Sequence, residues 1–231
     1  MNARRALLFP LFILITFFVQ SQEILFVGNS LTYTNDLPNI LEQIAAQYGK
    51  KVETESLSYP NYAIIDHLNE GKLQIILEEK SFDYLVVQQG PSSQEEGRKM
   101  LIEDGEKLKT LCDKHKIQLV YFMVWTSKSW YQTMDQVIEN HTMAAKQNKA
   151  LLFPVGKVWK AFLEKSPTTN LYDSDGFHPS KAGSFLAALT MFHNLYPDSD
   201  LSQLQSQFYK DWTFSQKEYD ILVQTIKTEL N

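Results

Sequence analysis

The stretch Glu23-Ile24-Leu25-Phe26-Val27-Gly28-Asn29-Ser30 joins a short apolar run to a glycine and a polar turn. The run predicts a strand over 23–28, and Ser30 follows directly after it. Continuous apolar runs predict two more buried strands, over 82–88 and 117–125. The other predicted elements are strands over 51–57 and 151–155, and helices over 36–48, 66–79 with a break at Gly71, 95–115, 133–148, 179–195 and 215–230.

This alternation of strands and helices predicts an α/β protein. Helices of this length between strands require right-handed crossovers and a parallel sheet with helices on both faces. In such sheets the active site lies at the carboxyl ends of the strands. Ser30, Gln88-Gln89-Gly90 and Trp125-Thr126-Ser127 all follow predicted strands. We therefore expect these polar segments to meet at one edge of a single domain.

Composition excludes some classes of protein. The chain has 231 residues, of which 44% are hydrophobic and 21% charged, a balance typical of a globular domain. The net charge of -5 argues against a protein that binds nucleic acid, which usually has a basic face. The single cysteine, Cys112, cannot form an internal disulfide, and its place in a helical pattern predicts a small buried side chain.

Residues 1–21 have the pattern of a secretory signal peptide. Arg4 and Arg5 precede an apolar run over 6–19, and Val19 and Ser21 suit the positions before a cleavage site. The run is shorter than the roughly 20 apolar residues that a membrane span needs. We expect an exported, periplasmic or extracellular protein whose mature domain covers 22–231. An uncleaved N-terminal anchor is the alternative.

Three residues far apart in the chain can form a catalytic triad. The hydroxyl of Ser30 is a weak nucleophile that must give its proton to a base. Asp175 precedes His178 by three residues in a loop that contains Gly176, so the carboxylate can fold back onto the imidazole. Pro179 suits the first position of the helix that follows. The alternative is that Ser30 belongs to a plain turn and that His178 only caps a helix.

Both segments resemble motifs of the SGNH, or GDSL-type, hydrolases. Gly28-Asn29-Ser30-Leu31-Thr32 is similar to the first block of that family, with Asn29 where many members have Asp, and Asp175-Gly176-Phe177-His178-Pro179 is similar to its last block. The resemblance covers roughly 23–195. It implies a flavodoxin-like three-layer α/β/α sandwich with a central parallel sheet of about five strands. It also implies Ser30 as nucleophile, His178 as base, Asp175 as its orienting partner, and neither a metal nor an organic cofactor.

The middle blocks depart from the family pattern. The family stabilises the oxyanion with the nucleophile's own N–H, a glycine N–H and an asparagine side chain. Here the second block lacks glycine, and we expect Asn61 to replace it because Asn tolerates similar backbone conformations. The third block lacks Asn. There the resemblance to sialic-acid and xylan O-acetylesterases favours Gln89 as donor, with Gln88 second, and a hole that used Ser92 instead would be weaker.

Three further residues are predicted to contact substrate: Gln88, Trp125 and Trp130. The two tryptophans can line a sugar-binding cleft, or they can belong to a hydrophobic lid or the core. His67 matches a motif of carbohydrate-esterase relatives, or packs against the sheet as a helix N-terminal residue.

Together the patterns predict a secreted serine esterase that removes short acyl groups, such as acetyl, from a carbohydrate or another small molecule. The acyl and carbohydrate preferences rest on the resemblance alone. We expect no nucleic-acid partner and no stable membrane insertion after signal cleavage. The alternatives are a lipid-directed acylhydrolase or lysophospholipase, and a carbohydrate-binding relative that has lost activity.

Overall fold

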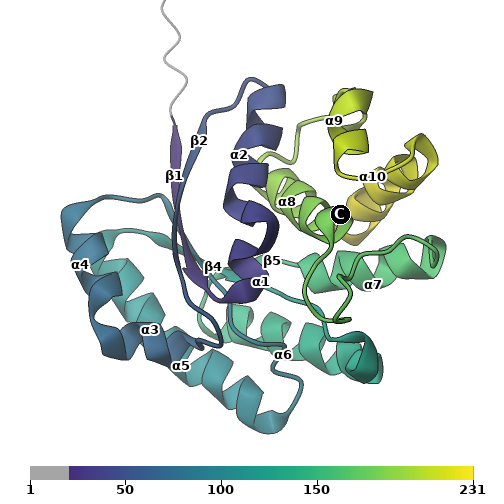
Figure 1. Cartoon of the computed structure of the whole chain (residues 1–231). Helices are drawn as coiled ribbons and strands as arrows, with labels where there is room; N and C mark the ends of the chain where they lie inside the picture. Colours follow the sequence, from purple (N-terminus) through teal and green to yellow (C-terminus); the bar gives the residue numbers. More distant parts are fainter. Residues whose placement is uncertain (1–20, 231) are drawn as a thin grey trace, which may run out of the picture.

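A computed structural model describes residues 21–230, so the predicted signal peptide lies outside the described residues but for Ser21. Five parallel strands form the central sheet in the order β2-β1-β3-β4-β5 (Figure 1). This confirms the predicted parallel sheet, in which β2 and β5 are the edge strands. The strands are β1 (Gln22–Gly28), β2 (Val52–Ser58), β3 (Tyr84–Val87), β4 (Gln118–Phe122) and β5 (Leu151–Phe153).

Helices cover both faces of the sheet, which gives the predicted three-layer sandwich (Figure 1). On one face lie α2 (Leu37–Gln47), α7 (Val155–Lys165), α8 (Lys181–Leu195), α9 (Ser206–Asp211) and α10 (Gln216–Leu230). On the other lie α3 (Ile64–Glu70), α4 (Lys72–Glu79), α5 (Glu95–His115) and α6 (Met134–Gln147). The shorter helical segments are α1 (Ser30–Tyr33), η1 (Thr34–Asp36), η2 (Lys128–Thr133) and η3 (Leu201–Gln203).

The alternation of side chains along β1 builds two separate cores. Ile24 and Phe26 point into the core beneath α2 and α8, whereas Leu25 and Val27 point into the core beneath α3 to α6. Successive strand residues face opposite sides, so a central strand must be apolar throughout to serve both cores. This is why the strand reads as a continuous apolar run.

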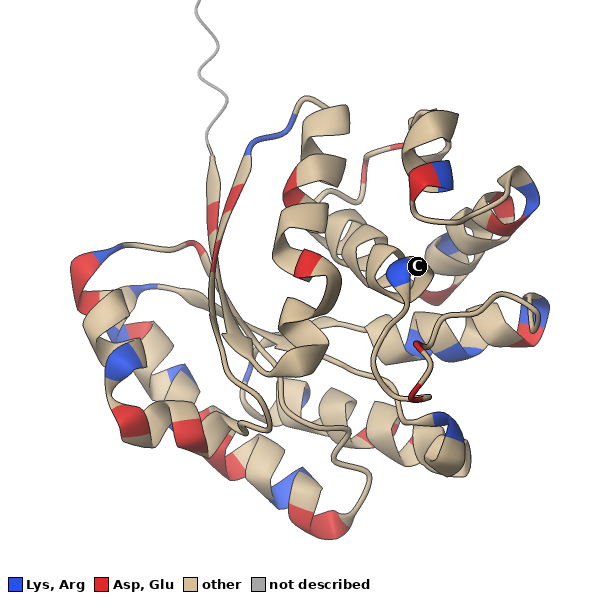
Figure 2. Ribbon diagram, in the orientation of Figure 1, with Lys and Arg blue, Asp and Glu red and all other residues tan. Residues whose placement is uncertain are grey.

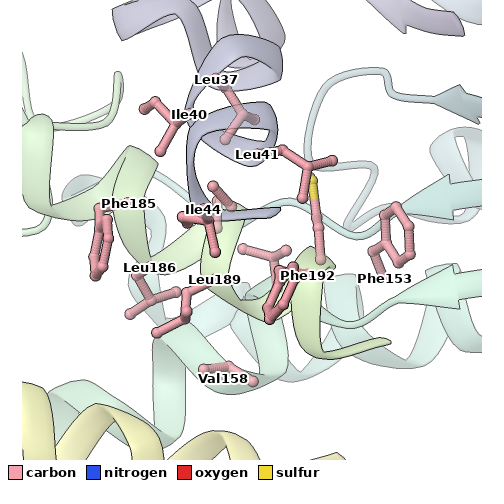
Figure 3. Packing of buried hydrophobic residues seen from close by; sticks show 14 of the residues in the cluster. Leu37, Ile40, Leu41, Ile44, Phe153, Val158, Phe185, Leu186, Leu189 and Phe192 are labelled. Carbon is pink, nitrogen blue, oxygen red and sulfur yellow. The ribbon is translucent and has the colours of Figure 1, made fainter. Parts of the chain in front are cut away.

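Helices α2 and α8 pack directly against each other over the sheet. Figure 3 shows the apolar side chains of α2 facing those of α8, which are completely buried. The α2 side chains recur at helical spacing and so form one stripe. The residues labelled there are Leu37, Ile40, Leu41 and Ile44 on α2, and Phe185, Leu186, Leu189 and Phe192 on α8.

Helix boundaries follow capping chemistry more closely than the sequence pattern indicated. α8 begins at Lys181 rather than at Pro179, because the Ser180 hydroxyl accepts a hydrogen bond from Gly183 N–H and caps the helix. The predicted break at Gly71 separates α3 from α4, and its φ of 78° is one that glycine adopts at little cost. Helix α7 was not predicted from the sequence, and it follows β5 directly.

The surface and the cysteine agree with the composition. Lys and Arg are scattered over several elements rather than gathered on one face (Figure 2). Across residues 21–230, every helix is too short or too polar to span a bilayer. Cys112 is fully buried in the core beneath α5, and burial raises the pKa of its thiol to about 12. The thiol therefore stays protonated at neutral pH and is not a nucleophile.

Candidate active site

The serine turn begins where β1 ends. Asn29 caps the short helix α1: its side-chain oxygen accepts from Leu31 N–H at 3.1 Å. Its side-chain nitrogen donates to the Tyr62 carbonyl at 2.9 Å and so ties the turn to the loop after β2. Ser30 is the first residue of α1. The capping role was signalled in the sequence by an Asn before a helix start, although it was not predicted.

Ser30, His178 and Asp175 lie within hydrogen-bonding distance of one another. The His178 Nε2 atom is 2.9 Å from Ser30 Oγ, although 148 positions separate the two residues. The other ring nitrogen, Nδ1, is 2.5 Å from Asp175 Oδ2. A carboxylate on Nδ1 requires the proton there, which leaves Nε2 free to accept the serine proton. The three predicted catalytic side chains are thus brought together in the order that a serine triad needs.

The Asp175 carboxylate also holds the shape of its own loop. Its second oxygen, Oδ1, accepts the backbone N–H of Phe177 at 2.9 Å and that of His178 at 3.0 Å. Gly176 between them has a φ of 69°, a conformation in which glycine avoids strain. The bond from His178, followed by the two backbone donors, lowers the pKa of Asp175 to about 2. The carboxylate is therefore ionised at any pH at which an esterase would work.

Trp125 holds this loop from below and does not line a cleft. Its indole N–H donates to the Phe177 carbonyl at 3.0 Å, and its ring stacks on Trp159 at 3.9 Å. The side chain is 0% exposed, so it cannot contact substrate. The prediction of Trp125 as a substrate residue is wrong because β4 ends at Phe122 and the chain that follows turns into the core.

Gln88 is likewise a support for the serine turn. Its side-chain oxygen accepts from Asn29 N–H at 3.0 Å and from the Thr32 hydroxyl at 2.9 Å. Its amide nitrogen donates to the Gln89 carbonyl at 2.7 Å, and the residue is only 2% exposed. The predicted substrate contact is therefore corrected, because both ends of this amide are occupied inside the protein. Thr32, which the sequence analysis missed, completes the network.

Two of the predicted oxyanion donors, Ser30 and Asn61, would act through their backbone N–H groups. The N–H groups of Leu31, Thr32 and Tyr33 all donate to Asn29, and that of Ser30 has no acceptor between residues 21 and 230. Asn61 has a φ of 64° and follows Pro60 in a turn closed by the bond from Tyr62 N–H to the Tyr59 carbonyl, as in a type II turn. This is the glycine-like backbone expected there.

Gln89 is buried beside the serine loop and already partly engaged. Its side-chain oxygen accepts from Ile64 N–H at 3.3 Å, and its nitrogen donates to Ser92 Oγ at 2.9 Å. A primary amide has two hydrogens, so one is left uncommitted. Because Gln89 is as buried as Gln88, its role as an oxyanion donor stays a prediction. His67 is also buried, with Nε2 2.9 Å from the Gly28 carbonyl, and it packs against the sheet next to the serine turn.

A pocket of about 490 Å³ has Phe177, the residue before His178, among its lining residues. Trp130 lines it and is 63% exposed, in contrast to Trp125. Within the part of the chain that the structure describes, no three His, Cys, Asp or Glu side chains gather where they could hold a metal ion.

Comparisons with known proteins concern the fold and the class of enzyme. No protein-family model and no curated protein matches the chain. Among solved structures, a protein of Slackia heliotrinireducens assigned to the SGNH hydrolases is 25% identical, with a TM-score of 0.63 over 76% of this chain and 100% of that one. A DUF4886 family protein of Bacteroides uniformis is 14% identical, with a TM-score of 0.75 over 91% of this chain and 95% of that one.

An acetyl xylan esterase, AlAXEase, is 13% identical, with a TM-score of 0.62 over 75% of this chain and 99% of that one. At that identity, and at that of the Bacteroides protein, the likeness concerns the fold. The fold is the one that SGNH-type hydrolases have, and the Slackia neighbour supports the assignment of this chain to that class as a serine ester hydrolase.

Proposed function

We propose that the protein is an exported serine esterase that removes short acyl groups, above all acetyl, from a carbohydrate. The observation that carries the proposal is the 2.9 Å distance between Ser30 Oγ and His178 Nε2, with Asp175 on the far side of the imidazole. The signal-peptide pattern at 1–21 supports export. A fold shared with an acetyl xylan esterase supports the acyl and substrate classes.

The geometry supports a two-step acyl transfer. Ser30 Oγ attacks the ester carbonyl carbon while His178 Nε2 takes the hydroxyl proton, and Asp175 stabilises the imidazolium that forms. The tetrahedral oxyanion is held by the N–H groups of Ser30 and Asn61 and by the Gln89 amide. On collapse, the C–O bond to the alcohol breaks and His178 gives its proton to the departing oxygen.

Water completes the cycle on the acyl-enzyme. It attacks the acyl carbonyl, His178 accepts its proton, and the bond to Ser30 Oγ breaks as that proton returns to the serine. The acid is released and the free serine is restored. Every proton transfer in the reaction passes through His178 Nε2, so the reaction needs no group beyond the triad, the oxyanion donors and water.

Hydrolysis of p-nitrophenyl esters from acetate to dodecanoate tests the proposal. We expect turnover that is fastest with acetate and that falls by roughly 10⁴-fold or more in Ser30→Ala. Ser56→Ala is the matched control, because Ser56 is exposed on the edge strand β2. A preference for dodecanoate would favour a lipid-directed acylhydrolase. Wild-type turnover that survives Ser30→Ala would refute the mechanism, and no turnover of any ester would point to an inactive binding relative.

A further inference from the structure

We propose that the pocket beside Phe177, called the Trp130 pocket below, binds an uncharged sugar ring of the alcohol half of the ester. This inference rests on the proposed esterase function and names the class of its substrate. The pocket has a volume of about 490 Å³, which lies in the range of small-molecule sites. Its lining residues are Pro91, Ser92, Ser93, Gln94, Gly97, Thr126, Ser127, Trp130, Thr133 and Phe177.

The pocket lies beside the residue next to His178, whose imidazole must protonate the departing alcohol. Phe177 lines it and precedes His178, and the ring centres of the two residues are 5.3 Å apart. His178 must protonate the departing alcohol oxygen, so that oxygen lies beside the imidazole during the reaction. In the proposed binding mode the group attached to that oxygen lies in the Trp130 pocket, whose wall includes Phe177.

The lining offers polar partners beside its apolar surface. Six of the ten residues carry a hydroxyl or an amide, and the apolar ones are a proline and two aromatics. No Leu, Ile, Val or Met lines the pocket, although aliphatic side chains fill both cores of this protein. The hydroxyls of Ser92 and Thr133 already have partners inside the protein. The side chains of Ser93, Gln94 and Ser127 have none among residues 21–230, and they would remain unpaired against a hydrocarbon, at a cost in binding free energy. They are instead the partners that sugar hydroxyls need.

The lining also excludes a strongly acidic sugar. None of its residues is charged, so a carboxylate on the substrate would find no counter-ion in the Trp130 pocket. A guanidinium is the group that binds carboxylates in two-pronged fashion. Arg98 is the only arginine between residues 21 and 230; it is not among the lining residues, and its side chain lies 3.8 Å from Glu95. The pocket thus favours a neutral sugar over an acidic one.

Trp130 provides a fixed aromatic platform for the ring. Its side chain is 63% exposed, yet its backbone is held from both sides: its N–H donates to the Ser127 carbonyl at 3.0 Å, and its carbonyl accepts from the Thr133 hydroxyl at 2.8 Å. An indole has only two side-chain torsions to fix, so binding against it loses little conformational freedom. An exposed indole held by a rigid backbone is suited to cover the apolar face of a pyranose ring.

The test compares three acetate esters that differ in the alcohol. They are ethyl acetate, an acetylated methyl β-xylopyranoside and an O-acetylated sialic acid, each followed by acid release. In the wild type we expect kcat/KM to be highest for the xyloside. In Trp130→Ala we expect KM for the xyloside to rise about tenfold, with kcat/KM for ethyl acetate unchanged within about twofold. Trp130→Phe keeps a ring and should lose less.

Ile75→Ala is the matched control, since Ile75 is 55% exposed on α4 and does not line the pocket. It should leave all three substrates unaffected. The inference is overturned if Trp130→Ala lowers activity equally on ethyl acetate and on the xyloside, if it leaves the xyloside unaffected, or if the sialic-acid ester is the better wild-type substrate. Failure of the esterase proposal looks different, because Ser30→Ala would then leave ethyl acetate hydrolysis unchanged or no ester would be hydrolysed at all.

Discussion

Replacing Trp125 by Phe removes one hydrogen bond from beneath the catalytic loop while it keeps a ring in the same place. The indole N–H donates to the Phe177 carbonyl at 3.0 Å. Leaving a partly buried carbonyl without its partner costs about 1–3 kcal/mol of unfolding free energy. In a chain of this length about 1 kcal/mol corresponds to roughly 2–4 °C in Tm. We therefore expect Trp125→Phe to lower Tm by roughly 2–12 °C, measured by calorimetry.

The same substitution should also slow the chemistry, because the Phe177 carbonyl belongs to the residue before His178. A loop free to shift by about 1 Å can cost up to about 10²-fold in rate. We expect kcat on ethyl acetate to fall by about 10-fold or more while KM changes little, at a temperature well below the lower Tm. A role in packing alone would move Tm and leave kcat in place.

Trp159→Phe is the matched control for this experiment. Trp159 stacks face to face on Trp125 and is equally buried, but among residues 21–230 it makes no hydrogen bond to the loop of Asp175 and His178. It should lower Tm through lost packing and leave kcat near the wild-type value. If both variants lose kcat equally, or if Trp125→Phe loses only stability, the assignment of Trp125 as a positioning residue is refuted.

Two further substitutions test the triad and the serine turn. Asp175→Asn should lower kcat by roughly 10³–10⁴-fold, because an amide no longer fixes the proton on His178 Nδ1. The pKa of Asp175 lies below its ordinary value, so the ionised form stabilises the fold. The wild type should therefore be more stable than Asp175→Asn above pH about 4, and this difference should vanish as the pH falls through about 2. Urea denaturation at a series of pH values measures it. Gly28→Ala should lower both Tm and kcat, since an added Cβ would lie 2.6 Å from Gln88 Oε1, whereas Gly90→Ala, where nothing lies within 4 Å, should change neither; equal effects of the two would contradict this reasoning.

The buried strands could be predicted because each appears in the sequence as a continuous run of apolar residues. A central parallel strand such as β1 serves two cores and must be apolar at every position. Helix α7 could have been predicted, because Val155, Val158, Trp159 and Phe162 recur at helical spacing. It was missed because it follows β5 directly, and the strand predicted over 151–155 already included its first residue, Val155. Helix starts such as that of α8 depended on which side chain caps, which the apolar pattern does not record.

The site divides in a similar way. Motif spacing predicted that Ser30, Asp175 and His178 would meet, and the structure brings them within hydrogen-bonding distance. The roles of Gln88 and Trp125 could not be predicted, because they are decided by contacts across more than fifty positions. Gln88 and Gln89 are adjacent and chemically identical, yet one faces the serine turn and the other Ile64 and Ser92. Only the backbone path between them separates the two roles.

Asp175 divides two tasks between the two oxygens of one carboxylate. Oδ2 meets the imidazole, while Oδ1 meets the backbone at Phe177 and His178. The four residues 175–178 therefore form one unit, in which the acid, the bend and the base have fixed mutual positions and which Trp125 holds at the Phe177 carbonyl. An insertion or deletion inside it would disconnect both tasks at once. Engineering of this enzyme should accordingly leave this unit and Trp125 together.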